Sequence, residues 1–445
     1  MSTTDPTPAF DGAAFGRRRF IQIGAGVAVT ALFAACSNKH PLGAPSSSTS
    51  TSTPPAGTAA GGGPSSVPST PGTFGAPTGT GASAPSAKTL VIVQLNGGND
   101  ALNTLVPNDG KYRDARPTLA LAEADLVALK GNDRWRLHPK LAPLTTYWES
   151  GTAAFLPGIG FNDPNHSHFV SLDRWWRADD MAAKTGWLGR SITDKAAAPL
   201  FATALGSGAP LLIGDAYQPA VVLEPAAFTL PAQLSGRALT ALATPRSADP
   251  LVALAQASFD STVSAVGSFA DLLNADPLSG DTVNYREGGF NLQEGLALAA
   301  RLITADVGAR IVVVSAGGFD THSNQLVTHA ALMTDLAAGI DAFMKAITAG
   351  GAADNTLLVT TSEFGRRVAE NASGGFDHGA GGMSMMFGPM VRSGVLTDID
   401  LNNQLDGDVR PTMDPRTMYT ACLDWLGADV EHALGKRYDE VKLLR

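Results

Sequence analysis

Three short apolar runs, each followed at once by a loop of glycines and acids, constrain the fold of this chain more than any other feature. The runs cover residues 90–95, 311–315 and 357–361, and their composition is typical of strands. The loops that follow them read NGGND, GGFDTH and SEFGRR. In an open parallel sheet, the loops beyond the carboxyl ends of the strands form the ligand crevice. The three loops are therefore predicted to share one site.

Further apolar runs alternate with stretches of helical period along the chain. Strands are predicted at 153–156, 210–213 and 383–387, and helices at 292–303 and 329–347. This alternation is typical of βαβ units, so we expect an α/β domain. Residues 228–281 are rich in Ala, Leu and Ser and are expected to form helices that cap or flank the sheet.

The N-terminal segment, residues 1–36, has the pattern of an export signal. Arginines at 17–19 precede an apolar stretch over residues 21–35, which predicts the twin-arginine route. The stretch is shorter than the ~20 residues that span a bilayer. It ends in Phe-Ala-Ala-Cys, which resembles a lipoprotein cleavage box, so we expect lipid on Cys36 and attachment to a membrane. The alternative is cleavage after Ala35, with Cys36 incidental.

The segment after the export signal has the composition of a linker. Residues 37–88 consist mostly of Ser, Thr, Pro, Gly and Ala. Such a segment cannot bury enough apolar surface to offset its ordering entropy, so we expect it to be disordered. The remaining residues, 89–445, are within the range of one large α/β domain. This organisation predicts an exported protein, lipid-anchored in the periplasm or cell envelope.

Charge and cysteine content exclude two further classes. The formal net charge is -9, and no Lys/Arg cluster supplies the basic face that nucleic acid requires, so no nucleic-acid partner is expected. The chain has 2 cysteines, Cys36 and Cys422. With Cys36 committed to lipid, an intramolecular disulfide framework is excluded.

Acidic and imidazole groups directly after the first two runs indicate metal ligation. Asp100 follows the first run on a Gly-rich turn, and a carboxylate there suits a hard cation. Asp320 and His322 follow the second run at a spacing of two, so both side chains would reach one cation. Oxygen together with imidazole suits zinc, manganese or iron. The alternative in each case is turn formation, in which Asn and Asp are common.

Two further positions extend this set. Glu363 directly follows the third run and opens a segment that we predict to be helical. Its alternative role is that of an acid favoured in a first helical turn. Asp377 and His378 lie in a stretch of glycines, where neither side chain would pack a core. A ligand or acid–base role is therefore favoured for this pair.

Ser167 is the predicted nucleophile. Apolar residues recur at helical spacing after it, so it lies near a helix N-terminus, where backbone N–H groups favour an anion. A hydroxyl in that position, flanked by His166 and His168, would attack a phosphate or sulfate ester. The alternative is that Ser167 or Asn165 only caps the helix, a role worth ~1 kcal/mol.

The charges decide whether these positions act together. If Asp100, Asp320, Glu363 and Asp377 converge, each like-charged pair ~4 Å apart costs about 4 kcal/mol at an effective dielectric constant near ~20. One or two divalent ions would offset this repulsion and activate a water molecule. We expect the ion to be zinc, manganese, calcium or iron.

Several longer motifs carry a family resemblance. They read LVIVQLNGGNDALNTLVP, LHPKLAPL, PNHSHF, GWLGR, GGFDTHSNQ, TSEFGRR and DHGAGG. On these motifs the chain resembles the domain of unknown function 1501 family, whose members are twin-arginine-exported and grouped with the alkaline phosphatase and sulfatase superfamily. The resemblance runs from Leu90 to the C-terminus. It implies an alkaline-phosphatase-like α/β fold, a three-layer sandwich with a central, mostly parallel sheet.

The resemblance also implies roles for single residues. Asp100 looks like the first-strand metal ligand of the superfamily and Ser167 like its nucleophile, and the later ligands look like Asp320, His322 and His378. The chain departs from the superfamily pattern at Glu363-Phe364, where an Asp-His pair is usual. This departure keeps a carboxylate and loses an imidazole.

Two functional hypotheses follow. The first is a lipid-anchored, metal-dependent hydrolase that acts on small-molecule or glycan esters of phosphate or sulfate. In it Ser167, His168 and Asp377 are catalytic, and the metal ligands are Asp100, Asp320, His322, Glu363 and His378. The second is a non-catalytic binding or assembly lipoprotein of the cell envelope that retains the fold, and Phe364 in place of a ligand favours it.

Overall fold

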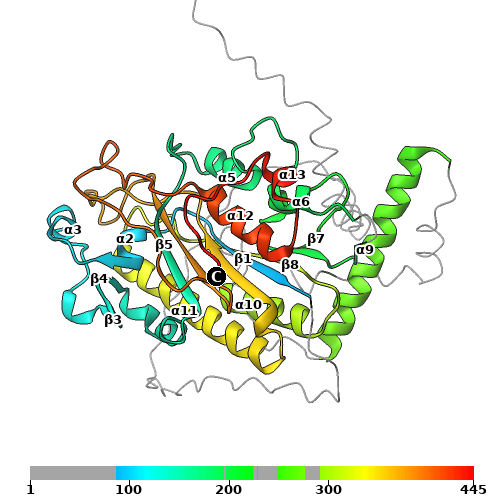
Figure 1. Ribbon diagram of the computed structural model, residues 1–445, viewed down its shortest axis with the longest axis horizontal. Helices are drawn as coiled ribbons and strands as arrows, with labels where there is room; N and C mark the ends of the chain where they lie inside the picture. The colour runs from blue at the N-terminus through cyan, green and yellow to red at the C-terminus, as the bar shows by residue number, and fades with distance from the viewer. Residues whose placement is uncertain (1–86, 195–196, 224–227, 229–247, 276–290) are drawn as a thin grey trace, which may run out of the picture. The chain divides into compact units, whose positions relative to one another are not determined.

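The computed structural model describes residues 87–194, 197–223, 228, 248–275 and 291–445 (Figure 1). The predicted export signal, the lipidation box and nearly all of the predicted linker lie outside the described residues. Much of the expected helical segment 228–281 does too, although α9 (Pro250–Ala275) falls within it. No helix in the described part of the chain is both long enough and apolar enough to cross a membrane.

The described fold is built on an eight-stranded sheet in the order β11-β5-β10-β9-β1-β8-β6-β7. The strands are β1 (Thr89–Leu95), β5 (Ala153–Ile159), β6 (Ala202–Leu205), β7 (Ala220–Val222), β8 (Ile311–Ala316), β9 (Thr356–Thr361), β10 (Gly382–Phe387) and β11 (Gly394–Val395). The run from β9 through β1, β8 and β6 to β7 is parallel, whereas β10 is antiparallel to both β9 and β5. A smaller sheet contains β2 (Leu105–Pro107), β4 (Asn132–Leu137) and β3 (Val127–Leu129).

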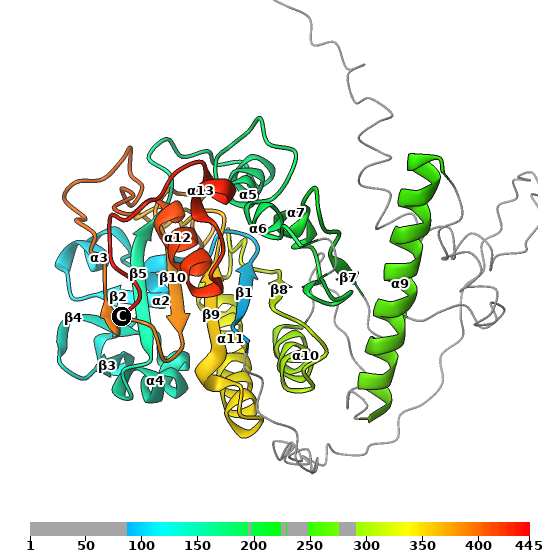
Figure 2. The ribbon, with the colours of Figure 1, turned by 45° about the vertical axis from the view of Figure 1, so that its right-hand side comes forward.

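Helices cover both faces of the large sheet (Figures 1 and 2). Besides α9, the longer ones are α5 (His168–Arg177), α10 (Leu292–Thr304), α11 (Gln325–Ala349) and α12 (Pro415–Leu426). The short ones are α2 (Ala101–Thr104), α3 (Gly110–Ala115), α4 (Thr145–Glu149), α6 (Trp187–Ser191), α7 (Ala209–Leu212) and α13 (Val430–Leu434). Single 3₁₀ turns lie at η1 (Glu123–Asp125), η2 (Pro139–Leu144) and η4 (Ala353–Asn355).

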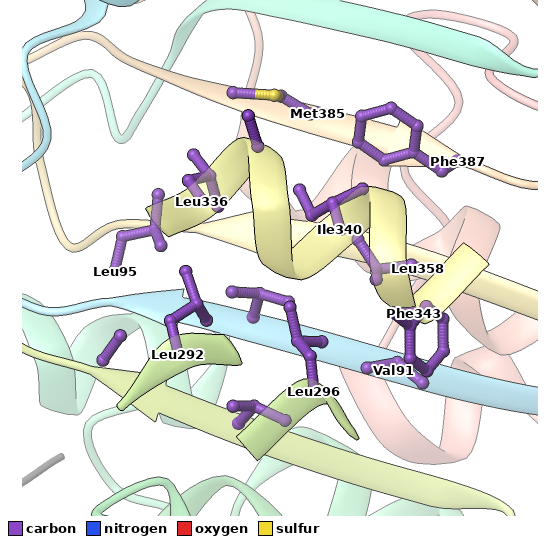
Figure 3. Close-up of a cluster of buried hydrophobic side chains, with 14 of the residues drawn as sticks. Val91, Leu95, Leu292, Leu296, Leu336, Ile340, Phe343, Leu358, Met385 and Phe387 are labelled. Atoms are coloured by element: carbon purple, nitrogen blue, oxygen red, sulfur yellow. The ribbon is translucent and has the colours of Figure 1, made fainter. Parts of the chain in front are cut away.

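Successive side chains of β1 point to opposite faces of the large sheet, and the helices they pack against show which face each helix covers. Val91 and Val93 belong to the apolar cluster that contains α10 and α11, and Leu90 and Ile92 belong to the cluster that contains α12. Side chains that alternate in this way bury both faces of a strand, as expected for a parallel sheet between two helical layers. Figure 3 shows the first cluster, in which Phe343 of α11 packs near Val91. The predicted fold class, an α/β sandwich around a mostly parallel sheet, is confirmed.

Local signals explain where α12 begins and ends. The Asp414 carboxylate accepts a hydrogen bond from the backbone N–H of Arg416 at 2.8 Å, and Pro415 occupies the first helical position. The helix ends at Gly427, which has a φ of 70° that a glycine adopts without strain. These signals fix the two ends of α12.

Most predicted elements are observed, and two predictions are wrong. The runs predicted as strands at 90–95, 153–156, 311–315, 357–361 and 383–387 are β1, β5, β8, β9 and β10, and the predicted helices are α10 and α11. Residues 210–213, predicted as a strand, instead contribute to the short helix α7, because Pro210 sits in the first turn, where its missing N–H is not needed. The segment after Glu363 is not helical, because the backbone of Gly365 and Arg367 pairs with residues 377–380 instead.

Candidate metal centre

Three loops meet at the carboxyl edge of the sheet because β9, β1 and β8 are neighbours. Gly97, in the loop after β1, has a φ of 121°. A Cβ atom at this position would collide with the backbone of Phe319 and Asp320 in the loop after β8. The close approach of the two loops therefore requires glycine here. This close approach places Asp320 next to the loop that follows β1.

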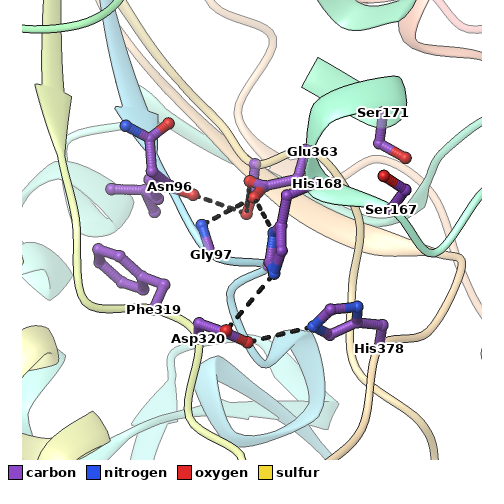
Figure 4. A network of polar contacts seen from close by, with 12 residues as sticks. Asn96, Gly97, Ser167, His168, Ser171, Phe319, Asp320, Glu363 and His378 are labelled. Carbon is purple, nitrogen blue, oxygen red and sulfur yellow. Dashed lines mark hydrogen bonds and ion pairs between the residues drawn. The ribbon is translucent and has the colours of Figure 1, made fainter. Parts of the chain in front are cut away.

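The Asp320 carboxylate lies between the imidazoles of His168 and His378 (Figure 4), and the imidazole of His322 lies against it as well. Its Oδ1 atom is 3.0 Å from Nε2 of His322 and 3.2 Å from Nε2 of His378. Its Oδ2 atom is 3.5 Å from Nε2 of His168. Three segments far apart in the sequence thus present the same ring nitrogen to one carboxylate.

The other nitrogen of each imidazole faces an oxygen acceptor. Nδ1 of His168 is 2.7 Å from Glu363 Oε1, and Nδ1 of His322 is 3.2 Å from Asp377 Oδ1. Nδ1 of His378 is 2.6 Å from the carbonyl oxygen of His166, which can only accept. A proton on each Nδ1 leaves each Nε2 with a lone pair directed at Asp320. This is how an oxygen partner orients a histidine that ligates a metal.

Two observations indicate that a cation fits among these atoms. Nε2 of His168 is buried and has no hydrogen-bond partner. Nε2 of His322 lies 2.9 Å from Nε2 of His378, so with both protons on Nδ1 two lone pairs face each other. Donor atoms of His168, Asp320 and His378 all lie within 4.8 Å of one another. Imidazole nitrogens with one carboxylate suit zinc, manganese or iron better than calcium, which takes oxygen ligands.

The pKa values of the three groups shift in different directions. The hydrogen bond with Glu363 raises the pKa of His168, against the effect of burial. Burial lowers the pKa of His378. Burial acts to raise the pKa of Asp320, but the hydrogen bond from Arg366 and the neighbouring charges outweigh it, so the pKa is lowered and the carboxylate is ionised.

The side chain of Arg366 connects the loops that surround Asp320. Its guanidinium is buried and donates from Nη2 to Asp320 Oδ1 at 2.7 Å. Nε donates to the carbonyl of Gly98 at 2.7 Å, and Nη1 donates to the carbonyl of Phe376 at 2.9 Å. Nη2 also donates to the carbonyls of Gly97 and Phe319. One side chain therefore fixes all three loops around the carboxylate.

Glu363 lies behind His168. Its Oε1 atom accepts hydrogen bonds from the backbone N–H of Gly97 at 2.8 Å and from His168 Nδ1 at 2.7 Å. Because Nδ1 and Nε2 lie on different edges of the imidazole, the structure places Glu363 on the edge away from Asp320. Asp377 has the same relation to His322, and Asn371 Nδ2 donates to it at 3.1 Å.

Asp100 is not brought to the cluster. It begins α2, where its Oδ1 accepts from the N–H of Leu102 at 3.2 Å. Its Oδ2 accepts from Arg116 Nη1 at 2.8 Å and from Gln325 Nε2 at 3.0 Å. The side chain is 1 % exposed. These contacts make Asp100 part of a buried ion pair.

Ser167 is the residue before α5 and makes no capping hydrogen bond with its side chain. Its backbone N–H donates to Asn165 Oδ1 at 2.8 Å. The residue is exposed, and Figure 4 shows it beside Ser171, with the His168 side chain extending from the same helix start toward Asp320. The structure thus places Ser167 next to the cluster in sequence, and in Figure 4 no dashed line joins its side chain to Asp320.

Sequence reasoning did not assign three residues that support the cluster. Arg366 stands in the SEFGRR motif and Asn371 follows it, so both had a local signal as neighbours of Glu363. Asp408, whose Oδ2 is 2.8 Å from His166 Nε2, had none, because it lies in a distant loop without a recognisable motif. This contact fixes the segment whose carbonyl orients His378.

Fold and cluster together define an α/β protein with a candidate metal centre of His168, Asp320 and His378, with His322 beside it, at the carboxyl edge of its parallel strands. Residues 250–439 match the model of the family described as "Protein of unknown function (DUF1501)". The match confirms, for this part of the chain, the family predicted from the motifs. No curated protein matches the chain in sequence.

Solved structures with a similar arrangement include two hydrolases. A phosphonate monoester hydrolase from Silicibacter pomeroyi is 9% identical, covers 80% of this chain and 78% of its own, and has a TM-score of 0.35. An alkaline phosphatase from the Antarctic bacterium TAB5 is 13% identical, covers 68% of this chain and 92% of its own, and has a TM-score of 0.27. At these values no residue role is carried over from either protein.

Proposed function

We propose that this protein is a metal-dependent hydrolase of phosphate or sulfate esters. The observation that carries the proposal is the convergence of three imidazole Nε2 atoms on Asp320, each imidazole being held through Nδ1 by an oxygen. His168, His322, His378 and Asp320 would hold the ion. The bound ion would polarise an ester oxygen and lower the pKa of a water molecule.

The chain's own residues then have defined tasks. Glu363 and Asp377 keep the protons of His168 and His322 on Nδ1, so that Nε2 stays available. Arg366 keeps Asp320 ionised and in place. Ser167, exposed and uncapped beside His168, is the nucleophile that we propose to test. Its Oγ would bond to phosphorus or sulfur and lose its proton while the alcohol leaves with one, and water would then cleave the new ester.

The first experiment combines elemental analysis with hydrolysis of 4-nitrophenyl phosphate and 4-nitrophenyl sulfate. We expect a transition metal in the purified protein and turnover of at least one ester. Asp320→Asn is expected to lose both the metal and the activity. Ser167→Ala is expected to keep the metal and lose activity, while Ser323→Ala, at an exposed serine in a neighbouring loop, keeps both. Unchanged turnover in Ser167→Ala would remove Ser167 from the mechanism and leave the metal-bound water as nucleophile.

The location is a separate part of the proposal. The arginines at 17–19 and the box that ends at Cys36 support export and a lipid anchor in the cell envelope. Expression of the full chain with Cys36→Ala is expected to release the protein from the membrane fraction. Replacement of Arg17 and Arg18 by Lys is expected to keep it from export. A protein that stays in the membrane fraction without Cys36 would contradict the anchor.

A second function is favoured by Phe364, which follows Glu363 where the superfamily pattern has an imidazole. This departure, with no drawn interaction between Ser167 and Asp320, favours a cell-envelope binding protein that holds a metal without catalysis. This function predicts full metal retention and no turnover over a broad panel of phosphate and sulfate esters. Glycan binding that depends on the metal would support it.

A further inference from the structure

Asp100 and Arg116 form a closed ion pair beneath the loop after β1. The exposed fraction is 1% for the Asp100 side chain and 0% for that of Arg116, and the atoms Nη1 and Oδ2 are 2.8 Å apart. Asp100 also accepts hydrogen bonds from Leu102 N and Gln325 Nε2. A buried carboxylate that accepts from these two donors and from the fixed cation Arg116 is enclosed by protein groups and not free to bind a metal ion.

Arg116 is fixed in this place by every part of its guanidinium. Nη1 donates to Asn103 Oδ1 at 2.8 Å as well as to Asp100. Nε donates to the carbonyl of Val368 at 3.0 Å, and Nη2 donates to the carbonyl of Arg367 at 3.1 Å. The guanidinium carbon also lies 3.9 Å from the centre of the Phe376 ring. The positive charge beside Asp100 is therefore permanent.

Arg366 pairs with the second acid, Asp320, whose side chain is 42% exposed and therefore open on one side. Arg366 is buried, pairs with Asp320 at 2.7 Å and donates to the carbonyl of Phe376. The two guanidinium groups thus meet at Phe376, one on its ring and one on its backbone. Both bind segments that carry the loops of the candidate metal centre.

We infer that this centre takes one metal ion and that Arg116 and Arg366 supply the positive charge that a second ion would bring. The inference rests on the proposed metal centre and is independent of ester hydrolysis. A second ion near Asp100 would have to displace a buried guanidinium with all its hydrogen bonds, which like-charge repulsion and desolvation oppose. The donor atoms of His168, Asp320 and His378, all within 4.8 Å of one another, would hold one ion, and His322 lies beside them.

The test is the number of ions per folded chain, measured by elemental analysis and native mass spectrometry after saturation with zinc or manganese. We expect one ion in the unchanged protein. Asp100→Asn is expected to keep that ion with an affinity within about threefold, and Asp320→Asn is expected to lose it. Two ions per chain, with one lost in Asp100→Asn, would overturn the inference, and so would a chain that binds none.

A second variant keeps the test informative if Asp100→Asn does not fold. Asp100→Asn leaves Arg116 buried without a charged partner, which destabilises the fold. The double variant Asp100→Asn with Arg116→Met removes the unpaired charge as well. If this variant folds and binds no ion, the inference is overturned. One retained ion supports it, whether or not the protein hydrolyses an ester.

Discussion

The proton positions of three histidines decide what the cluster around Asp320 can bind. His378 is the clearest case, because the carbonyl of His166 accepts from Nδ1 and leaves Nε2 as the only nitrogen with a lone pair. Glu363 and Asp377 have the same effect on His168 and His322. Glu363, Asp377 and the His166 carbonyl would therefore select Nε2 as the atom that binds the ion, without contacting the ion themselves.

Glu363→Gln tests this selection. The amide keeps the length of the side chain but removes the charge that holds the proton on Nδ1 of His168. We expect metal affinity to fall about 10–100-fold, the usual effect of losing such a partner. A competition titration with a chromophoric chelator measures it. Glu149→Gln, at an exposed acid outside the site, is the matched control and should bind as the unchanged protein does.

Metal binding should also weaken on acidification earlier than an ordinary histidine would predict. The hydrogen bond with Glu363 raises the pKa of His168, so a proton competes with the ion at a higher pH. His378, whose pKa burial lowers, stays neutral to a lower pH. Titration of zinc affinity from about pH 8 down to about pH 5 should show one early loss. In Glu363→Gln the onset should move to lower pH, and an unmoved onset would contradict the assignment to His168.

At this scale the sequence predicted residue types better than roles. Asp320, His322 and His378 were expected as ligands, and they do lie together. His168 was expected in catalysis and Glu363 as a ligand, whereas the structure puts His168 against Asp320 and Glu363 behind it. The position of a residue after a predicted strand indicates that its side chain lies near the others. It does not indicate which nitrogen of a histidine faces Asp320.

At the scale of elements, long strands and helices were predictable and short ones were not. β1, β8 and β9 are continuous β-branched or apolar runs, typical of buried parallel strands. β6 reads ATAL and β7 reads AVV, which are too short and too rich in alanine to stand out. Their place in the sheet is set by pairing with β8, a long-range contact that local pattern does not contain.

Helix α11 should carry much of the stability of its face. Phe343 is buried in the cluster that joins α11 to β1 and β9. Phe343→Ala should lower the free energy of unfolding by about 3–5 kcal/mol, because a cavity adds to the lost burial. Val327→Ala, on the first turn of the same helix but 68% exposed, should change it by less than about 0.5 kcal/mol. Urea denaturation followed by circular dichroism compares the two variants, and equal effects would contradict the packing.

At the scale of the whole molecule, the loops of the candidate site are joined by protein groups and do not depend on an ion for their positions. Removal of metal with a chelator should therefore leave the far-ultraviolet circular dichroism spectrum unchanged. Addition of zinc should raise the Tm progressively with its concentration, by an amount that corresponds to about 2.7 kcal/mol at ~100 times Kd. Loss of secondary structure on chelation would show that the ion, and not Arg366, organises the edge of the sheet.

The contact of Gly97 with the backbone of Asp320 has a consequence for how this protein tolerates change. Two main chains are in contact there, with no side chain between them. Substitutions that repack the apolar layers should therefore change the distances between the imidazoles very little. Substitutions deep in either layer would reduce how much folded protein accumulates while each folded copy keeps its ion-binding geometry. A single methyl group at residue 97 would instead force these two main chains apart and displace Asp320 from the imidazoles.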